Sequence, residues 1–207
     1  MLKRFLLVLA LAAVGASAYS QDFFHRPSPL AGRTLLTISL FEEVRTEIKS
    51  TDDQNKKADA LLEKMSADIQ EAVGGGDPAT IRPAIEKANA KYDEEVLKIY
   101  KDDQVKRLKE LYLQYNGNAA IQNAAYAKDV KLTDDQKTQL KKLQDEQFQK
   151  TMEAFQNGDF QTALPKLQED FNKSIEKMLT DDQKKKIKDM TGEKFKFKKV
   201  EGAGGGR

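Results

Sequence analysis

The stretch Leu132-Thr133-Asp134-Asp135-Gln136 decides the fold, because it holds a complete set of helix-start signals. Threonine is a favoured helix N-cap, whose hydroxyl accepts a backbone N–H of the first turn. A glutamine three residues later reaches back to the N–H of the cap and completes a capping box. The two aspartates between them place negative charge at the positive end of the helix dipole. We therefore predict that a helix begins directly after Thr133.

The same start occurs four times along the chain. It follows Thr51, Lys101, Thr133 and Thr180. Its glutamines are Gln54, Gln104, Gln136 and Gln183. Leu179 precedes Thr180 as Leu132 precedes Thr133. Apolar residues follow each glutamine by four and seven positions, so each glutamine shares a stripe with the core-facing residues of its helix. A polar group there should be hydrogen-bonded, either as a structural cap and clamp or as a contact for a partner.

A second pattern indicates that the chain is a duplication. Two apolar stripes with identical spacing run over residues 81–99 and 160–178. Their steps of three and four residues are those of one face of an α-helix. Thr80 and Thr162 each precede a proline by three residues, and we expect each threonine to cap its helix.

These patterns predict an all-α fold of antiparallel helical hairpins, in which two tandem helical repeats form one body. Repeat 1 is expected over residues 34–117 and repeat 2 over residues 118–198. Each repeat should contain a short lead-in helix, a hairpin of two long helices and a final helix. A flexible arm at residues 19–33 should precede the repeats, and a disordered glycine-rich tail at residues 199–207 should follow them.

The N-terminus has the order of a secretory signal peptide over residues 1–18. Lys3 and Arg4 come first, an apolar run follows, and small residues end at Ala18. The apolar run is about half of the roughly 20 residues that a membrane-spanning helix needs. We therefore expect cleavage near Ala18, a periplasmic or secreted location, and no membrane span after processing.

The composition argues against several classes of function. The chain has 35 Lys and Arg against 33 Asp and Glu, so no basic excess favours nucleic-acid binding. Cysteine is absent and His25 is the single histidine, which disfavours a metal sensor; the carboxylate pairs also lack the spacing of a calcium loop. Neither a Ser-His or Cys-His pair nor a glycine-rich phosphate loop is present. We expect no enzyme activity, no catalytic residues, no cofactor and no metal.

Residues 132–136 and 179–183, both Leu-Thr-Asp-Asp-Gln, resemble the Leu-Thr-x-x-Gln (LTxxQ) signature of the Spy/CpxP family. That family consists of small periplasmic all-α proteins, in which a shorter chain carries two such motifs and forms a cradle-shaped homodimer. The resemblance covers residues 34–198. It departs from the signature at Ser50 and at residues 100–101, where Leu or Leu-Thr is replaced.

The resemblance implies an ATP-independent holdase-type chaperone or an envelope-stress accessory protein, which binds unfolded clients or an envelope protein partner through a helical cradle. The doubled length implies a monomeric pseudo-dimer or a homodimer. Candidates for contact with clients are Phe148, Met152, Phe155 and Phe160, whose helical spacing also suits an ordinary core. The alternative function is that of a structural or scaffold protein of the cell envelope with no chaperone activity.

Overall fold

The computed structural model describes residues 34–74 and 78–197, and all regular structure within these ranges is helical. Repeat 1 contains α2 (Leu35–Ser39), α3 (Glu42–Glu47), α4 (Asp52–Gly74), α5 (Pro78–Leu97) and α6 (Asp102–Asn116). Repeat 2 contains the 3₁₀ helix η2 (Gly117–Gln122), α7 (Ala124–Asp129), α8 (Asp134–Asn157), α9 (Phe160–Met178) and α10 (Asp181–Asp189). The all-α prediction is confirmed. The predicted signal peptide, arm and tail lie outside the described residues.

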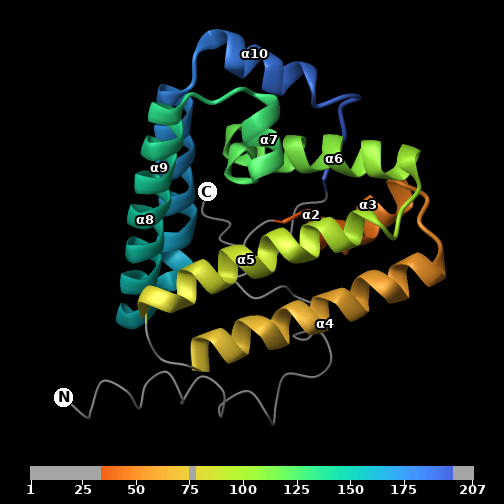
Figure 1. The fold of residues 1–207 in the computed structure, drawn as a ribbon, viewed down its shortest axis with the longest axis horizontal. Helices are drawn as coiled ribbons and strands as arrows, with labels where there is room; N and C mark the ends of the chain where they lie inside the picture. Colours follow the sequence, from red (N-terminus) through yellow and green to blue (C-terminus); the bar gives the residue numbers. More distant parts are fainter. Residues whose placement is uncertain (1–33, 75–77, 198–207) are drawn as a thin grey trace.

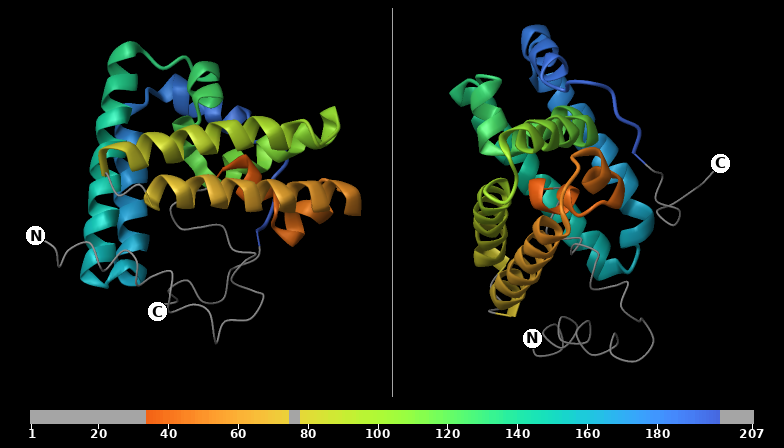
Figure 2. Two further views of the ribbon diagram at one scale, coloured as in Figure 1. Left: turned by 60° about the horizontal axis from the view of Figure 1, so that its bottom comes forward. Right: turned by 90° about the vertical axis from the view of Figure 1, so that its right-hand side faces the viewer.

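Two long hairpins dominate the molecule (Figure 1). α4 packs against α5, and α8 packs against α9. Both views of Figure 2 show the α8–α9 hairpin lying across the end of the α4–α5 hairpin at which α5 begins. Arg82 of α5 ties the hairpins together, because its guanidinium pairs with Asp145 of α8 and with Glu86 of α5. In the described ranges, every helix is too short or too polar to cross a bilayer.

The four predicted helix starts are where helices begin, but two other local expectations are wrong. The lead-in of each repeat is two short helices, because the chain turns at residues 40–41 and again at Asn123, which caps α7 by accepting the N–H of Ala125 (3.0 Å). α5 and α9 begin two residues before Thr80 and Thr162, so these threonines are not caps. The Thr162 hydroxyl instead donates to the Asp159 carbonyl (2.8 Å).

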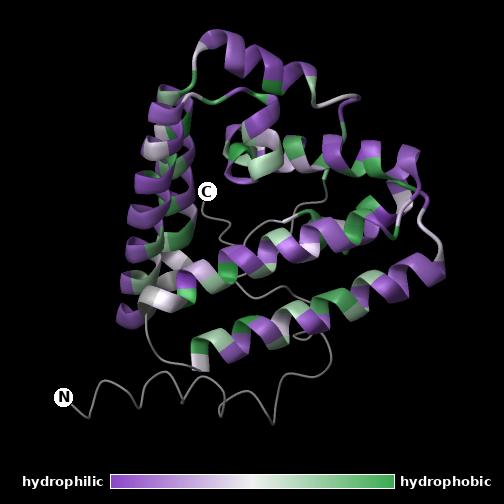
Figure 3. Cartoon of the chain, viewed as in Figure 1, coloured by the Kyte–Doolittle hydropathy of each residue, from purple (hydrophilic) through white to green (hydrophobic). Residues whose placement is uncertain are grey.

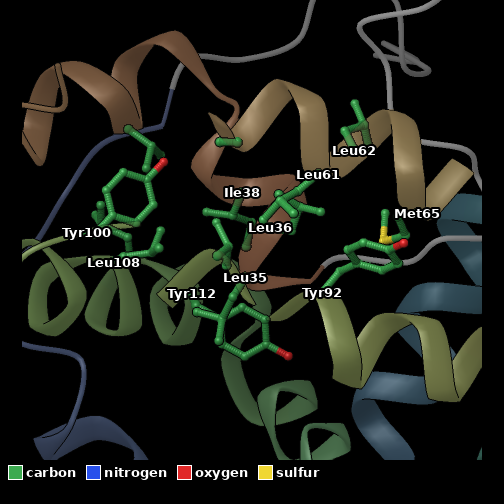
Figure 4. Packing of buried hydrophobic residues seen from close by; sticks show 14 of the residues in the cluster. Leu35, Leu36, Ile38, Leu61, Leu62, Met65, Tyr92, Tyr100, Leu108 and Tyr112 are labelled. Carbon is green, nitrogen blue, oxygen red and sulfur yellow. The ribbon is translucent and has the colours of Figure 1, made fainter. Parts of the chain in front are cut away.

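The core of repeat 1 is built around its first lead-in helix. α2 buries Leu35, Leu36 and Ile38 against α4, α5 and α6. Figure 4 shows these side chains beside Leu61, with Met65 and Tyr92 on one side and Tyr100 and Leu108 on the other. A buried aliphatic side chain contributes roughly 1.5–3 kcal/mol relative to an exposed one, so α2 is a principal source of stability.

The core of repeat 2 is smaller and lies where α8 and α9 meet the lead-in and α10. Its buried members are Ala119, Ile121, Val130, Leu132, Leu140, Phe171, Ile175, Met178, Leu179 and Ile187. The leucines that precede two of the threonine caps therefore lie in this core. Further along the hairpin, toward the turn between α8 and α9, most inward-facing side chains are only half-buried.

The C-terminal segment of residues 191–197 returns to repeat 1 and lies along α6. Gln114 of α6 donates to two carbonyls of this segment (2.6 and 2.7 Å) and accepts the N–H of Phe195 (2.7 Å). The rings of Phe195, Phe197 and Tyr115 meet edge to face, with 5.0 Å between neighbouring centroids. The end of repeat 2 is thereby fixed to the last helix of repeat 1.

Lys49 and Lys131 occupy equivalent turns and both have left-handed backbones, with φ of 52° and 58°. Each lies just beyond a short helix, and the N–H of the next residue bonds to the carbonyl five residues before it (3.0 and 3.1 Å). This is a Schellman turn, in which glycine is the favoured residue. Both side chains are exposed.

Replacing Lys49 by glycine should therefore raise the free energy of unfolding by about 0.5–1 kcal/mol, because the left-handed conformation is strained for residues with a β-carbon. Urea unfolding of the variant and of wild type measures the change. Lys98, which lies outside such a turn, is the control position: Lys98→Gly should give no gain. A loss of stability in Lys49→Gly would contradict this account of the turn.

Candidate functional site

Gln54 and Gln104 form a reciprocal pair in repeat 1. The Gln54 Nε2 donates to Gln104 Oε1 (2.8 Å), and the Gln104 Nε2 donates to Gln54 Oε1 (3.2 Å). Each Oε1 also accepts the backbone N–H of its own helix cap at 3.0 Å. The second N–H of Gln54 reaches the Ile99 carbonyl (3.0 Å), and that of Gln104 is shared between the carbonyls of Ile48 (3.0 Å) and Lys49 (3.1 Å). Both side chains are buried with their hydrogen-bonding groups satisfied.

Gln136 and Gln183 repeat this arrangement in repeat 2. Their amides exchange bonds of 2.7 and 2.8 Å, and each Oε1 accepts its cap N–H at 3.0 Å. Gln136 donates to the Met178 carbonyl (3.0 Å), and Gln183 donates to the Lys131 carbonyl (3.4 Å). In both repeats each glutamine thus holds the carbonyl two residues before its partner's cap. The second pair differs in being half-buried.

We call each of these pairs a glutamine clamp. A clamp joins the starts of two helices about 50 residues apart, so it closes the open end of each hairpin. The hydroxyls of Thr51, Thr133 and Thr180 accept the N–H of the glutamine that follows (3.2–3.3 Å), while Lys101 has no hydroxyl to do so. The glutamine amides make their bonds within the chain, which favours the cap-and-clamp interpretation over a partner contact.

The two hairpins differ in how well their inner faces are covered. In repeat 1 the stripe that includes Met65, Ile69, Ile85 and Ala88 is buried. The corresponding positions of repeat 2, aligned on the clamps, are Gln147, Thr151, Leu164 and Leu167. These four residues are half-buried. Repeat 2 therefore has an inner face that its own chain covers only in part.

The lead-ins of the two repeats differ as well. α2 covers its hairpin with Leu35, Leu36 and Ile38. The equivalent residues of η2 are Gly117, Asn118 and Ala120. η2 also packs mainly on α9, α7 and α6, whereas α2 packs on both helices of its hairpin. The two lead-ins therefore pack on different helices around their hairpins.

Two of the predicted client-facing residues lie on this poorly covered part of repeat 2. Phe148 and Met152 are half-buried on α8, and repeat 1 has Ser66 and Gln70 at the equivalent positions. The side chains of Phe155 and Phe160, the other two candidates, lie outside what the structure describes. Figure 3 shows apolar residues between α8 and α9, whereas the outward turns of α8 are hydrophilic.

We define the apolar stripe of repeat 2 as Phe148, Met152, Leu164 and Leu167. Phe148 and Met152 lie one turn apart on α8, as Leu164 and Leu167 do on α9, so each pair lies on one face of its helix. Apolar side chains that stay partly exposed are available for contact with another protein. Sequence periodicity found the two α8 members, but it gave no sign that Leu164 and Leu167 would be less buried than Ile85 and Ala88.

Asp93 is a buried acid that joins the two repeats. Its Oδ1 accepts the N–H of Leu36 at the start of α2 (3.0 Å), and its Oδ2 accepts Nδ2 of Asn123 at the start of α7 (3.1 Å). Burial raises the pKa of Asp93 from 3.8 to about 6, although hydrogen bonds from Leu36 and Thr34 act in the opposite direction. Asp93 is not among the residues predicted from sequence, where its one signal is its place beside the core residue Tyr92.

The raised pKa of Asp93 predicts how the stability changes with pH. The folded chain binds the carboxyl proton of Asp93 more tightly than the unfolded chain does. The stability that this proton contributes is therefore fully present below about pH 4 and is lost as pH rises through about 6. Two pKa units correspond to about 3 kcal/mol. The unfolding free energy of wild type relative to Asp93→Asn, which cannot titrate, should fall by about this amount from pH 4 to pH 7. A pH-independent difference would contradict the assignment.

Comparison of the chain with protein-family models, with curated protein sequences and with solved structures finds no match. Among residues 34–74 and 78–197, no group of three or more His, Cys, Asp or Glu side chains is placed to hold a metal ion. The chemistry that the described site offers is apolar contact on the α8–α9 hairpin, held in shape by the glutamine clamp at its base.

Proposed function

We propose that the chain is an exported, ATP-independent, chaperone-like protein, or a related envelope-stress accessory, that holds unfolded proteins on the apolar stripe of repeat 2. The observation that carries this proposal is the contrast between the repeats. The inner stripe of one hairpin is buried, whereas the equivalent hairpin leaves apolar side chains only half-buried. The predicted signal peptide and the resemblance to the Spy/CpxP signature support the same conclusion.

A holdase needs weak, adaptable apolar contacts rather than a shaped pocket. Phenylalanine and methionine suit this task, since methionine in particular is flexible and adapts to irregular partners. Charged residues of both signs surround the stripe on α8 and α9, including Lys150, Glu153, Lys166 and Glu169. Such a rim keeps the hairpin soluble while the stripe stays available to an unfolded segment.

The test measures whether the mature chain suppresses the aggregation of a second protein that unfolds on heating. The key variant is Phe148→Ser/Met152→Gln, which gives α8 the residues that repeat 1 has at these positions. Each lost side chain contributes roughly 1.5–3 kcal/mol when buried, so the variant should need roughly tenfold more protein for the same suppression. The matched control is Ser66→Ala/Gln70→Ala in repeat 1, which should act like wild type.

Absence of suppression by the wild-type chain at molar excess would contradict the chaperone proposal. Binding of one folded envelope protein under the same conditions would then favour the alternative function of a structural or scaffold protein. Circular dichroism of each variant confirms that it is folded, so that a loss of suppression reports on the stripe.

A further inference from the structure

We infer that the surface of α6 under the C-terminal segment is a binding site for an extended segment of a partner protein that carries aromatic side chains two residues apart. Residues 193–197, which we call the strap, occupy this site in the structure, and a partner segment binds by replacing them. Figure 1 shows the chain running from the end of α10 to α6. The inference concerns a surface of repeat 1 and does not depend on the proposed function, which concerns the stripe of repeat 2.

Side chains of α6 hold the backbone of the strap. Gln114 Nε2 donates to the Glu193 carbonyl (2.7 Å), and Gln114 Oε1 accepts the N–H of Phe195 (2.7 Å). Arg107 Nη1 donates to the same carbonyl (2.9 Å) and is itself paired with two glutamates of repeat 1. Every residue except proline carries both a backbone N–H and a carbonyl. A segment of different sequence can therefore make the same bonds to α6.

The two phenylalanines of the strap supply the selective part of the contact. Phe195 and Phe197 are half-buried, whereas the lysines on either side of Phe195 are exposed, as expected of an extended chain with one face on the protein. The Phe197 ring lies 5.0 Å from those of Phe195 and Tyr115, and Tyr115 lies 5.4 Å from Phe41. Aromatic rings in edge-to-face contact attract one another beyond the area that they bury. The surface therefore favours segments with aromatic residues at positions i and i+2.

The attachment of the strap allows it to be exchanged. It forms no helix, and both of its phenylalanines keep part of their surface exposed. It follows α10, the last helix of the part of the chain that the structure describes, so it can leave α6 without a change in any helix. Its departure exposes more of the Tyr115 ring and of the Gln114 amide, which are the groups that bind the next segment.

The probe is a fluorescent peptide with the sequence of residues 192–199, whose binding to the full mature chain is followed by fluorescence anisotropy. The strap of wild type competes with the peptide. Phe195→Ser/Phe197→Ser weakens the strap and leaves α6 intact, so it should bind the peptide at least roughly tenfold more tightly, because apparent affinity scales with the fraction of open sites. The matched control is Lys194→Ser/Lys196→Ser, which changes the exposed positions of the strap and should bind the peptide as wild type does.

A second variant opens the site without a change in the strap itself. Gly192 has a left-handed φ of 64°, and a β-carbon there would overlap the Glu110 carboxylate. Gly192→Ala should therefore also tighten peptide binding severalfold. Adding Gln114→Leu to Phe195→Ser/Phe197→Ser should weaken binding roughly tenfold, because the hydrogen bonds to the peptide backbone are lost. A control peptide with serine in place of both phenylalanines should bind roughly tenfold more weakly than the probe.

Three results would overturn the inference. Equal binding by wild type and Phe195→Ser/Phe197→Ser, or no binding by either, would show that α6 does not accept a separate segment. Equal binding of the control peptide would show that the aromatic pattern is not recognised. A doubled mass of wild type in solution that reverts in Phe195→Ser/Phe197→Ser would show that a second copy, and not a partner protein, supplies the segment. Circular dichroism confirms that each variant is folded, and all of them keep Phe148 and Met152, so the aggregation assay is an independent test.

Discussion

Replacement of Gln54 by leucine is expected to lower the free energy of unfolding by about 2–4 kcal/mol, a large loss for one polar side chain. Gln54 is 9% exposed, and its amide is hydrogen-bonded to the Gln104 amide, to the N–H of its own helix cap and to the Ile99 carbonyl. Leucine removes all of these bonds at a buried pair of amides, where water replaces them poorly. Urea unfolding followed by circular dichroism measures the loss.

The equivalent change in repeat 2 is the matched control. Gln136 makes the same kinds of bond, but its surroundings are half-exposed, so water replaces the lost amide. Gln136→Leu should therefore cost about 1 kcal/mol or less. The double variant Gln54→Leu/Gln104→Leu should cost less than the sum of its two single changes, since the partners satisfy each other. Equal losses for Gln54→Leu and Gln136→Leu would contradict this account of the clamps.

Replacement of Leu36 by alanine should lower the free energy of unfolding by about 3–4 kcal/mol, because the side chain is 0% exposed and lies in the core of repeat 1. Leu164→Ala, on the half-buried stripe of repeat 2, should cost about 1 kcal/mol. Thermal unfolding of both variants gives the comparison. If Leu164→Ala costs as much as Leu36→Ala, the stripe is ordinary core and the functional proposal loses its basis.

Local signals explain why so much of the fold was predictable from sequence. The starts at Thr51, Thr133 and Thr180 are capping boxes, whose hydrogen bonds join residues three apart, so the sequence contains all their partners. Even Lys101 starts a helix, because Gln104 still accepts the cap N–H. The glutamines were placed on the core stripe, but their pairing depends on how two distant helix starts meet.

The parts that could not be predicted depend on packing between distant segments. The bend within each lead-in, the attachment of residues 191–197 to Gln114, and the burial of Asp93 all involve partners far apart in the chain. Sequence symmetry also hid the contrast in burial between the hairpins, since matching stripes predict two similar hairpins. The signal that could have revealed it is the presence of Gln147 and Thr151 where repeat 1 has Met65 and Ile69.

The central claim is that repeat 2, and not repeat 1, holds unfolded clients. A photo-crosslinking amino acid placed at Met152, or at the equivalent Gln70, tests it most directly in the presence of a heat-unfolding client. Both positions lie on the first long helix of their hairpins, and Gln70 is the more exposed. The account predicts client crosslinks from position 152 and few from position 70. Equal crosslinking at both positions, or crosslinking at position 70 alone, would contradict it.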